Sequence, residues 1–156
     1  MRLDQTGLDR WGRRIGEALA TPAVIALTGP LGAGKSVLAR AIGAGAGVDE
    51  TMPSPSHSLL FRYPTPSGRD VVHLDLYRLS SSDDVWELGW SQLGAEHEIV
   101  LIEWPERARG LLPRDHWEIE LSVPPAHVHL RDVAVRRVGT PPELPGFPMS
   151  VSVSAG

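Results

Sequence analysis

The stretch Gly29-Pro30-Leu31-Gly32-Ala33-Gly34-Lys35-Ser36 fits the phosphate-binding pattern G-x-x-x-x-G-K-[ST] at every position. Residues 23–28 before it, Ala-Val-Ile-Ala-Leu-Thr, predict a short buried strand. Residues 37–42 after it, Val-Leu-Ala-Arg-Ala-Ile, predict the start of a helix. Because strand, glycine loop and helix follow in the order that phosphate binding requires, we predict a P-loop at residues 29–36.

The residue types in this loop predict how it binds a nucleotide. Glycines allow backbone N–H groups to curl round a phosphate, and the N-terminus of the next helix adds positive potential. The loop residues expected to bind the nucleotide are Gly29, Leu31, Gly32, Ala33, Gly34, Lys35 and Ser36. Lys35 should reach the β- and γ-phosphates, and the Ser36 hydroxyl should bind Mg²⁺. Lys35 is also the single lysine beside fourteen arginines, at a point where a compact charge is wanted.

Length and composition favour one ordinary globular domain. The chain has 156 residues, 42% of them hydrophobic, without an apolar run that could span a membrane or a signal-peptide core. It has no cysteine, which excludes disulfides and thiol chemistry. A net charge of −4 argues against a stand-alone nucleic-acid binder, which would usually be basic. We expect a cytoplasmic protein that binds neither membranes nor DNA.

Hydrophobic periodicity predicts the remaining elements. Residues 8–20 should form an amphipathic helix capped by Thr6 or Asp9, and residues 80–89 a shorter one. The apolar face of the first helix comprises Leu8, Trp11, Ile15, Ala18 and Leu19. Residues 1–4 could be an edge strand or a frayed end. Residues 1–138 are expected to form the domain, and 139–156, rich in proline, glycine and serine, a loosely held tail.

The predicted strands indicate a mixed sheet in an α/β protein. Strands at 59–63 and 70–76 are separated by five turn residues, and strands at 116–123 and 128–138 by a proline turn. Each pair should therefore be antiparallel, which makes a purely parallel sheet unlikely. Residues 99–102 predict a further, buried strand that ends in Glu103.

Two carboxylates are placed to complete a nucleotide site. Hydrolysis or phosphoryl transfer needs an acidic group near Mg²⁺, usually at the carboxyl end of an apolar strand. Asp75 ends Val-Val-His-Leu-Asp, and Glu103 ends Ile-Val-Leu-Ile-Glu. Either could lie beside Ser36 if its strand neighbours the P-loop strand, and either could instead be an ordinary charge at the end of a strand. A hydroxyl from the loop at 51–58 could sense the γ-phosphate, and the choices are Thr51, Ser54, Ser56 and Ser58.

Several other residues have a functional and a structural interpretation. His57 and His73 could be metal ligands, but without cysteine or a third spaced ligand the structural interpretation is favoured. Trp104 could be a stacking platform or part of the core. Arg62 and Arg78 could contact phosphate, although salt bridges are the commoner use of arginine. The chain has no N-K-x-D sequence, which disfavours a GTPase of the Ras type.

The motifs, taken together, resemble the bacterial TsaE (YjeE) family of ATPases in tRNA threonylcarbamoyladenosine biosynthesis. The resemblance rests on G-x-L-G-A-G-K-S, then S-P-S, then H-L-D-L-Y-R-L, then I-E-W-P, and runs from about residue 8 to residue 138. It implies a three-layer P-loop NTPase-like fold with a mixed parallel and antiparallel sheet. It also implies ATP and Mg²⁺ as cofactors, and hydrolysis that is slow without partners. The partners implied are TsaD and TsaB homologues, through which the chain would act indirectly on tRNA.

The resemblance also assigns roles to individual positions. Lys35 and Ser36 become the phosphate and Mg²⁺ residues, Asp75 the Walker B-like aspartate, and Glu103 a glutamate needed for hydrolysis near Mg²⁺ or the attacking water. Trp104 matches a functionally important tryptophan, which favours a role in the nucleotide site. Ser56 stands where the family usually has threonine, and keeps the hydroxyl that could sense Mg²⁺ or the γ-phosphate. His57 replaces the usual aromatic residue and Pro30 a common aspartate.

Two rival functions remain open at this point. A small-molecule kinase would also use a P-loop, but it would need an acceptor pocket and a lid with phosphate-directed arginines. A nucleotide-dependent interaction module would use Asp75 and Glu103 only to position Mg²⁺, without turnover. Release of free phosphate, compared with a phosphorylated product or with no product, distinguishes the three.

Overall fold

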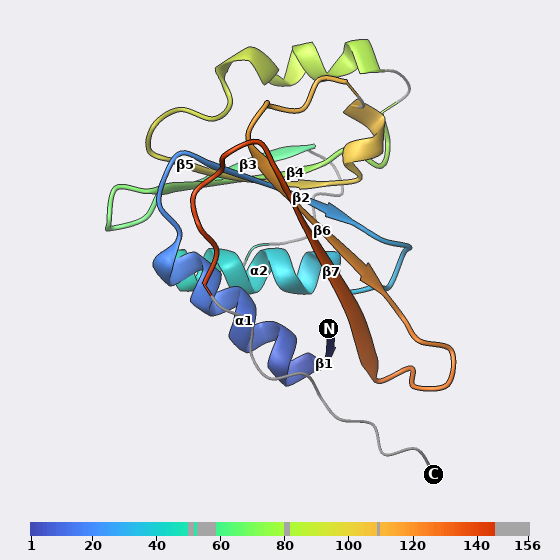
Figure 1. Cartoon of the computed structure of the whole chain (residues 1–156). Coiled ribbons are helices and arrows are strands. Elements are labelled where there is room, and N and C mark those ends of the chain that lie inside the picture. The colour runs from blue at the N-terminus through green and yellow to red at the C-terminus, as the bar shows by residue number, and fades with distance from the viewer. Residues whose placement is uncertain (50–51, 53–58, 80–81, 109, 146–156) are drawn as a thin grey trace.

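The computed structural model describes residues 1–49, 52, 59–79, 82–108 and 110–145 (Figure 1). These residues form one mixed sheet with helices on both faces, which confirms the predicted α/β fold. The strands are β1 (Arg2–Asp4), β2 (Ala23–Thr28), β3 (Leu60–Tyr63), β4 (Asp70–Asp75), β5 (Glu98–Glu103), β6 (His116–Ser122) and β7 (Leu130–Val138). The helices are α1 (Gln5–Ala18), α2 (Lys35–Ala46) and the 3₁₀ helices η1 (Ser82–Leu88), η2 (Trp90–Gln92) and η3 (Pro105–Ala108).

The sheet has the order β1-β7-β6-β2-β5-β4-β3. Its central strands β6, β2, β5 and β4 are parallel, because helices or long segments connect them. The outer pairs β3–β4, β6–β7 and β1–β7 are antiparallel, as the short turns predicted for the first two pairs. The P-loop strand β2 therefore lies in the middle of the sheet, and every residue of the neighbouring strand β5 is buried.

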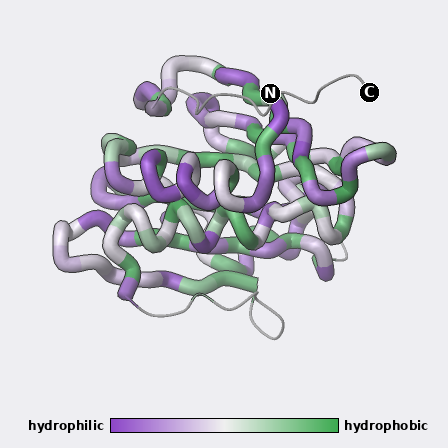
Figure 2. The backbone as a smooth tube through the Cα atoms, turned by 90° about the horizontal axis from the view of Figure 1, so that it is seen from below, coloured by the Kyte–Doolittle hydropathy of each residue, from purple (hydrophilic) through white to green (hydrophobic). Residues whose placement is uncertain are grey.

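Helices α1 and α2 pack against each other and cover one face of the sheet (Figure 1). Hydrophilic and hydrophobic residues alternate along α1, as expected when one side of a helix is buried, whereas α2 is mostly apolar or small with only Lys35 and Arg40 charged (Figure 2). The two helices approach so closely that a Cβ on Gly16 would lie 2.0 Å from the carbonyl oxygen of Ile42. Small residues at this crossing are therefore required by packing.

The start of α1 differs from the sequence prediction. The helix begins at Gln5, and its cap is Asp4, whose Oδ1 accepts a 2.7 Å hydrogen bond from the Gly7 N–H. Neither Thr6 nor Asp9 is the cap, because the chain enters the helix directly from the edge strand β1. Ala18 is exposed, whereas the other four predicted apolar positions are buried.

The opposite face of the sheet is covered by the 3₁₀ helices. A second apolar cluster lies there, formed by residues of β4 and β5 together with Leu79, Val85 and Trp90. The predicted helix near residues 80–89 is present as η1, a tighter 3₁₀ helix. With α1 and α2 on one side and η1–η3 on the other, the sheet is the middle of three layers.

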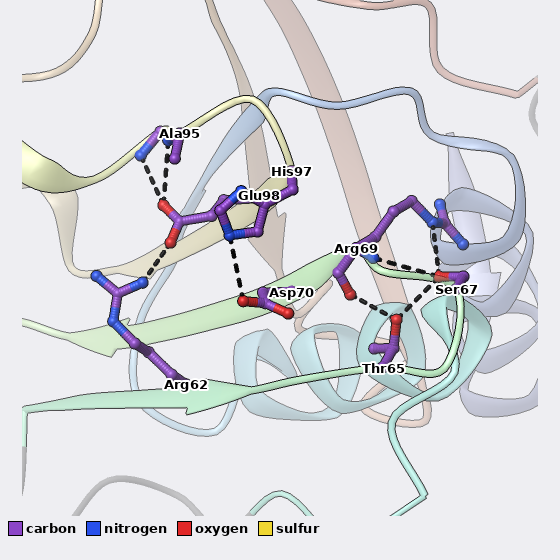
Figure 3. Close-up of polar contacts among 9 residues, drawn as sticks. Arg62, Thr65, Ser67, Arg69, Asp70, Ala95, His97 and Glu98 are labelled. Atoms are coloured by element: carbon purple, nitrogen blue, oxygen red, sulfur yellow. Dashed lines mark hydrogen bonds and ion pairs between the residues drawn. The ribbon is translucent and has the colours of Figure 1, made fainter.

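A buried carboxylate at the start of β5 joins this strand to the turn before it and to the edge strand β3 (Figure 3). Glu98 is only 2% exposed, and its Oε1 accepts hydrogen bonds from the backbone N–H groups of Gly94 and Ala95 at 3.0 and 3.2 Å. Arg62 donates to the other oxygen from β3. Arg62 is therefore used in a salt bridge, as the structural interpretation predicted, at the end of the sheet away from the P-loop.

Residues 139–145 lie against the body of the protein. The Trp117 indole N–H donates a 2.8 Å hydrogen bond to the carbonyl of Pro142, and Leu144 packs against the core beneath α1 and α2. The remaining predicted tail, 146–156, lies outside the described residues, so the boundary at residue 138 stays a prediction. In the described ranges, no helix is long and apolar enough to cross a membrane.

Candidate nucleotide site

The predicted P-loop forms a tight turn between β2 and α2. Gly29, Gly32 and Gly34 all have positive φ angles, of 139°, 80° and 102°. At Gly29 the reason is a close approach as well, because a Cβ there would lie 2.3 Å from the carbonyl oxygen of Leu121. The loop lines a cleft of about 760 Å³, whose far side comes from the starts of α1 and β7. Glycine is thus required by the backbone, and the loop faces a space large enough for a nucleotide.

Sheet register places both predicted carboxylates at this cleft. Glu103 is paired with Leu27 at the end of the P-loop strand, and on its other side with Asp75 of β4. Because parallel strands end at the same edge of a sheet, Asp75, Glu103 and the P-loop converge there. The Ser36 hydroxyl donates to the Glu103 carboxylate, lying 3.0 and 3.2 Å from its two oxygens. Glu103 is therefore the nearer partner of the predicted Mg²⁺ residue.

Lys35 is held in the loop by its own backbone and by an aromatic ring. Its Nζ donates to the carbonyl oxygens of Gly29 and Pro30, and lies 3.9 Å from the centre of the Trp104 ring. Burial lowers the pKa of the Lys35 ammonium, while the negative charge of Glu103 opposes that change. The Lys35 ammonium has thus lost part of its hydration in the cleft, and the negatively charged oxygens of a bound phosphate would replace the lost water contacts.

Trp104 belongs to the cleft as well as to the edge of the second apolar cluster. It has a φ of 58°, which is uncommon for a bulky residue and turns the chain sharply after β5. Its ring packs on Lys35 from one side and against Tyr77, with ring centres 5.0 Å apart. Trp104 therefore packs at the edge of the core and also lines the cleft, and its role as a stacking platform stays a prediction.

Asp75 lies one strand further from the P-loop than Glu103. Its Oδ1 accepts a 3.0 Å hydrogen bond from the Tyr77 N–H, which fixes the carboxylate at the end of β4. Burial raises the pKa of Asp75, and the neighbouring negative charge of Glu103 acts in the same direction. A divalent cation between these carboxylates would relieve both effects.

The donor set suits Mg²⁺ better than a transition metal. Among the described residues, no three His, Cys, Asp or Glu side chains converge on one point. Ser36, Glu103 and Asp75 instead offer one hydroxyl and two carboxylates, which are hard oxygen ligands. Mg²⁺ commonly takes one or two carboxylates and completes its shell with phosphate oxygens and water. The residues present therefore fit Mg²⁺ bound together with a nucleotide.

His73 is a residue of this site whose role the sequence interpretation missed. It is completely buried, and its Nε2–H donates to the Glu103 carboxylate at 2.5 Å. It is therefore a core histidine with a polar partner in the site. The available signal was its spacing of two from Asp75, which places both side chains on one face of the strand.

Arg131 was also missed. It lies at the start of β7 and lines the cleft, and its guanidinium donates to the P-loop carbonyls of Gly32 and Ala33. Nothing in the local sequence distinguishes it from the other thirteen arginines. The hydroxyl candidates Thr51, Ser54, Ser56 and Ser58, together with His57, lie outside the described residues, and their roles stay predictions.

Comparison with known proteins gives a consistent assignment. The family described as "Threonylcarbamoyl adenosine biosynthesis protein TsaE" matches residues 3–129. A Treponema pallidum protein named tRNA threonylcarbamoyladenosine biosynthesis protein TsaE is 35% identical over 115 residues, covering 73% of this chain and 83% of that protein. A protein of the same name from Mycobacterium tuberculosis is 37% identical over 118 residues, covering 71% and 70%.

A solved structure has the same fold. The crystal structure of YdiB from Bacillus subtilis superposes with a TM-score of 0.68, covering 89% of this chain and 84% of that one. Sequence identity is 18%, so this likeness concerns the fold.

Proposed function

The chain belongs to the TsaE family of tRNA threonylcarbamoyladenosine biosynthesis proteins, and on that premise we propose that it is the Mg²⁺-dependent, ATP-hydrolysing subunit of this modification. One observation carries the proposal. The Ser36 hydroxyl of the P-loop is hydrogen-bonded to Glu103, a carboxylate from the neighbouring parallel strand, at the mouth of a nucleotide-sized cleft. A phosphate loop and an acidic residue in direct contact are the parts that nucleotide hydrolysis requires.

The residues of the chain have separable tasks in this reaction. Loop N–H groups and Lys35 bind the phosphates, and Lys35 neutralises charge that develops on the γ-phosphate. Ser36, Glu103 and Asp75 would hold Mg²⁺, which supplies further neutralisation of the phosphate oxygens when bound. Glu103 or Asp75 orients the attacking water. Trp104 keeps the Lys35 ammonium over the loop by packing on it.

Family membership supports a proposal for where this activity takes place and on what it acts. We propose that the chain acts in the cytoplasm on a complex of TsaD and TsaB homologues, and reaches tRNA through them. Hydrolysis would be weak alone and stimulated by that complex. The modified nucleoside would be the adenosine beside the anticodon, with the chain supporting turnover of the complex.

Nucleotide binding is tested with Lys35→Ala. Isothermal titration with ATP and Mg²⁺ should show binding by the wild type and no useful binding by the variant, because the negative charge of the phosphates loses the Lys35 ammonium that neutralises it. Arg14→Ala, an exposed cation on α1, is the matched control and should bind as the wild type. Equal affinity of Lys35→Ala and wild type would contradict the phosphate-binding role.

Turnover is tested by phosphate release from ATP with and without TsaD and TsaB. Stimulation by the pair supports the proposed function, and absence of any binding to the pair in every nucleotide state refutes it. The rival kinase would instead transfer labelled phosphate to a metabolite in a cell extract. An interaction module would bind the pair with ATP but release no phosphate.

A further inference from the structure

The guanidinium of Arg131 joins two segments that are far apart in the sequence. Its Nε–H donates to the carbonyl of Ala33 at 2.9 Å, and Nη2 donates to the carbonyl of Gly32 at 3.3 Å. Nη1 donates to the carbonyls of Val128 and Leu130, both at 2.8 Å. One rigid, planar group therefore connects the P-loop to the beginning of β7.

These contacts determine how the last peptide groups of the loop are oriented. In a trans peptide, the C=O and the following N–H point in opposite directions. Holding the carbonyls of Gly32 and Ala33 on the Arg131 side therefore turns the N–H groups of Ala33 and Gly34 to the other side, where the Ala33 N–H donates a 3.1 Å hydrogen bond to the carbonyl of Pro30. Gly34 is the N-cap of α2, and a Cβ on it would lie 3.8 Å from the Arg131 Nε. Arg131 thus lies directly behind the point where the loop enters the helix.

Arg131 also differs from the neighbouring arginines of β1 and β7 in the groups that surround its charge. Arg2 and Arg136 are paired with the carboxylates of Asp132 and Glu118, at 2.7 Å each. Within the described part of the chain, the partners of Arg131 are main-chain carbonyls and include no carboxylate. Its positive charge is therefore not neutralised by an ion pair there, and it lies in the wall of the cleft, where it favours an anion.

The strand that carries Arg131 is itself anchored. Leu3 of β1 is the register partner of Arg131, and the Arg2–Asp132 pair lies beside it. The Val133 N–H donates to the carbonyl of Met1 at 2.7 Å. Pairing with β1 therefore restrains the start of β7, and with it the position of the Arg131 guanidinium beside the loop.

We propose that Arg131 is a positioning residue for the P-loop, which holds the peptide groups at Gly32–Gly34 in the orientation that binds nucleotide phosphate. The inference rests on the proposed nucleotide site. It adds that the backbone conformation of the phosphate loop depends on an arginine of β7 as well as on the glycines of the loop itself. Two properties act together, namely the bridge to the loop carbonyls and the uncompensated charge.

The test compares Arg131→Ala, Arg131→Lys and Arg136→Ala. Titration with ATP and Mg²⁺ should give a dissociation constant for Arg131→Ala that is about 10- to 100-fold above wild type, as expected when hydrogen bonds from a charged group are lost. Arg131→Lys keeps the charge but cannot bridge four carbonyls, so its affinity should be intermediate. Arg136 lies on the same strand and pairs with Glu118, so Arg136→Ala should bind as the wild type.

A second measurement detects positioning without nucleotide. Hydrogen exchange of the peptide spanning residues 29–36 should be faster in both Arg131 variants, while exchange in β2 and in the second half of α2 stays unchanged. A general loss of stability would speed exchange in all three segments and would contradict the proposed local role.

The outcomes separate this inference from the proposed function. If the wild type does not bind ATP, the proposed function fails, whatever the variants do. If the wild type binds and Arg131→Ala matches it in affinity and exchange, the positioning role is wrong and the proposed function stands. If Arg131→Ala does not fold, Arg131→Lys decides, because affinity equal to wild type would overturn the bridge and weaker binding with faster loop exchange would support it.

Discussion

Replacing His73 by leucine tests whether this buried histidine holds the glutamate of the nucleotide site. His73 is fully buried, Glu103 is 2% exposed, and the hydrogen bond between them is 2.5 Å long. Leucine fills a similar volume but cannot donate, so the Glu103 carboxylate keeps only the Ser36 hydroxyl among its described side-chain partners. Hydrogen bonds to a charged group contribute about 1.5–3 kcal/mol, because the charge must otherwise stay buried and unpaired. We expect a loss of about 2 kcal/mol in the free energy of unfolding.

The assay is thermal unfolding followed by phosphate release with TsaD and TsaB. For a chain of this size, about 2 kcal/mol lowers the melting temperature by about 4–8 °C. Misplacing a carboxylate through the residue that supports it typically costs about 10- to 100-fold in activity or metal affinity. His73→Gln, which restores an N–H near the same position, should recover part of both losses.

The matched control is His97→Leu. His97 also faces a carboxylate, with its Nε2 3.3 Å from Asp70, but its side chain is 55% exposed (Figure 3). Water screens such a pair, so its loss should cost at most about 1 kcal/mol. The reasoning is refuted if His73→Leu unfolds at the wild-type temperature, or if the exposed His97 proves as costly to replace as the buried His73.

Three further predictions concern the cleft and the helix crossing. Burial raises the pKa of Asp75 in the folded chain, and a carboxyl of this kind contributes stability at low pH that is lost as the pH rises through its folded pKa. Asp75→Asn should therefore raise the melting temperature at pH 7 while abolishing Mg²⁺-dependent turnover, and the gain should vanish in acid; a gain that persists there would contradict the account. Trp104→Ala should weaken ATP binding by about 2- to 30-fold, because the contact of the ring with Lys35 contributes about 0.5–2 kcal/mol. Trp104→Phe keeps an aromatic ring and should weaken binding by less. Equal affinities of the two variants, measured by titration, would exclude a contribution from the ring contact. Gly16→Ala should cost about 1–3 kcal/mol or more in urea unfolding, because its Cβ would lie 2.0 Å from the Ile42 carbonyl, whereas the exposed Arg14→Ala should stay within about 0.5 kcal/mol.

Much of the fold was predictable because its signals are local. The P-loop at 29–36, the hairpin of β3 and β4 and the pair β6–β7 each lie within one short stretch of chain, where turn residues and periodicity apply directly. The cap of α1 was predicted wrongly for the opposite reason. Asp4 caps the helix because β1 enters it without a loop, and that arrangement depends on the pairing of β1 with β7 at the other end of the sequence.

The sequence by itself determined which residue types the candidate site contains, and the types and spacing of Lys35, Ser36, Asp75 and Glu103 are the basis for predicting phosphate and Mg²⁺ binding. Only the tertiary structure decided how these residues meet. Parallel strands are joined through long connections, so no local pattern tells that β5 lies between β2 and β4, and that Glu103 rather than Asp75 touches Ser36. The same holds for Arg131, which reaches the loop from 98 residues away because the sheet order brings β7 to that edge.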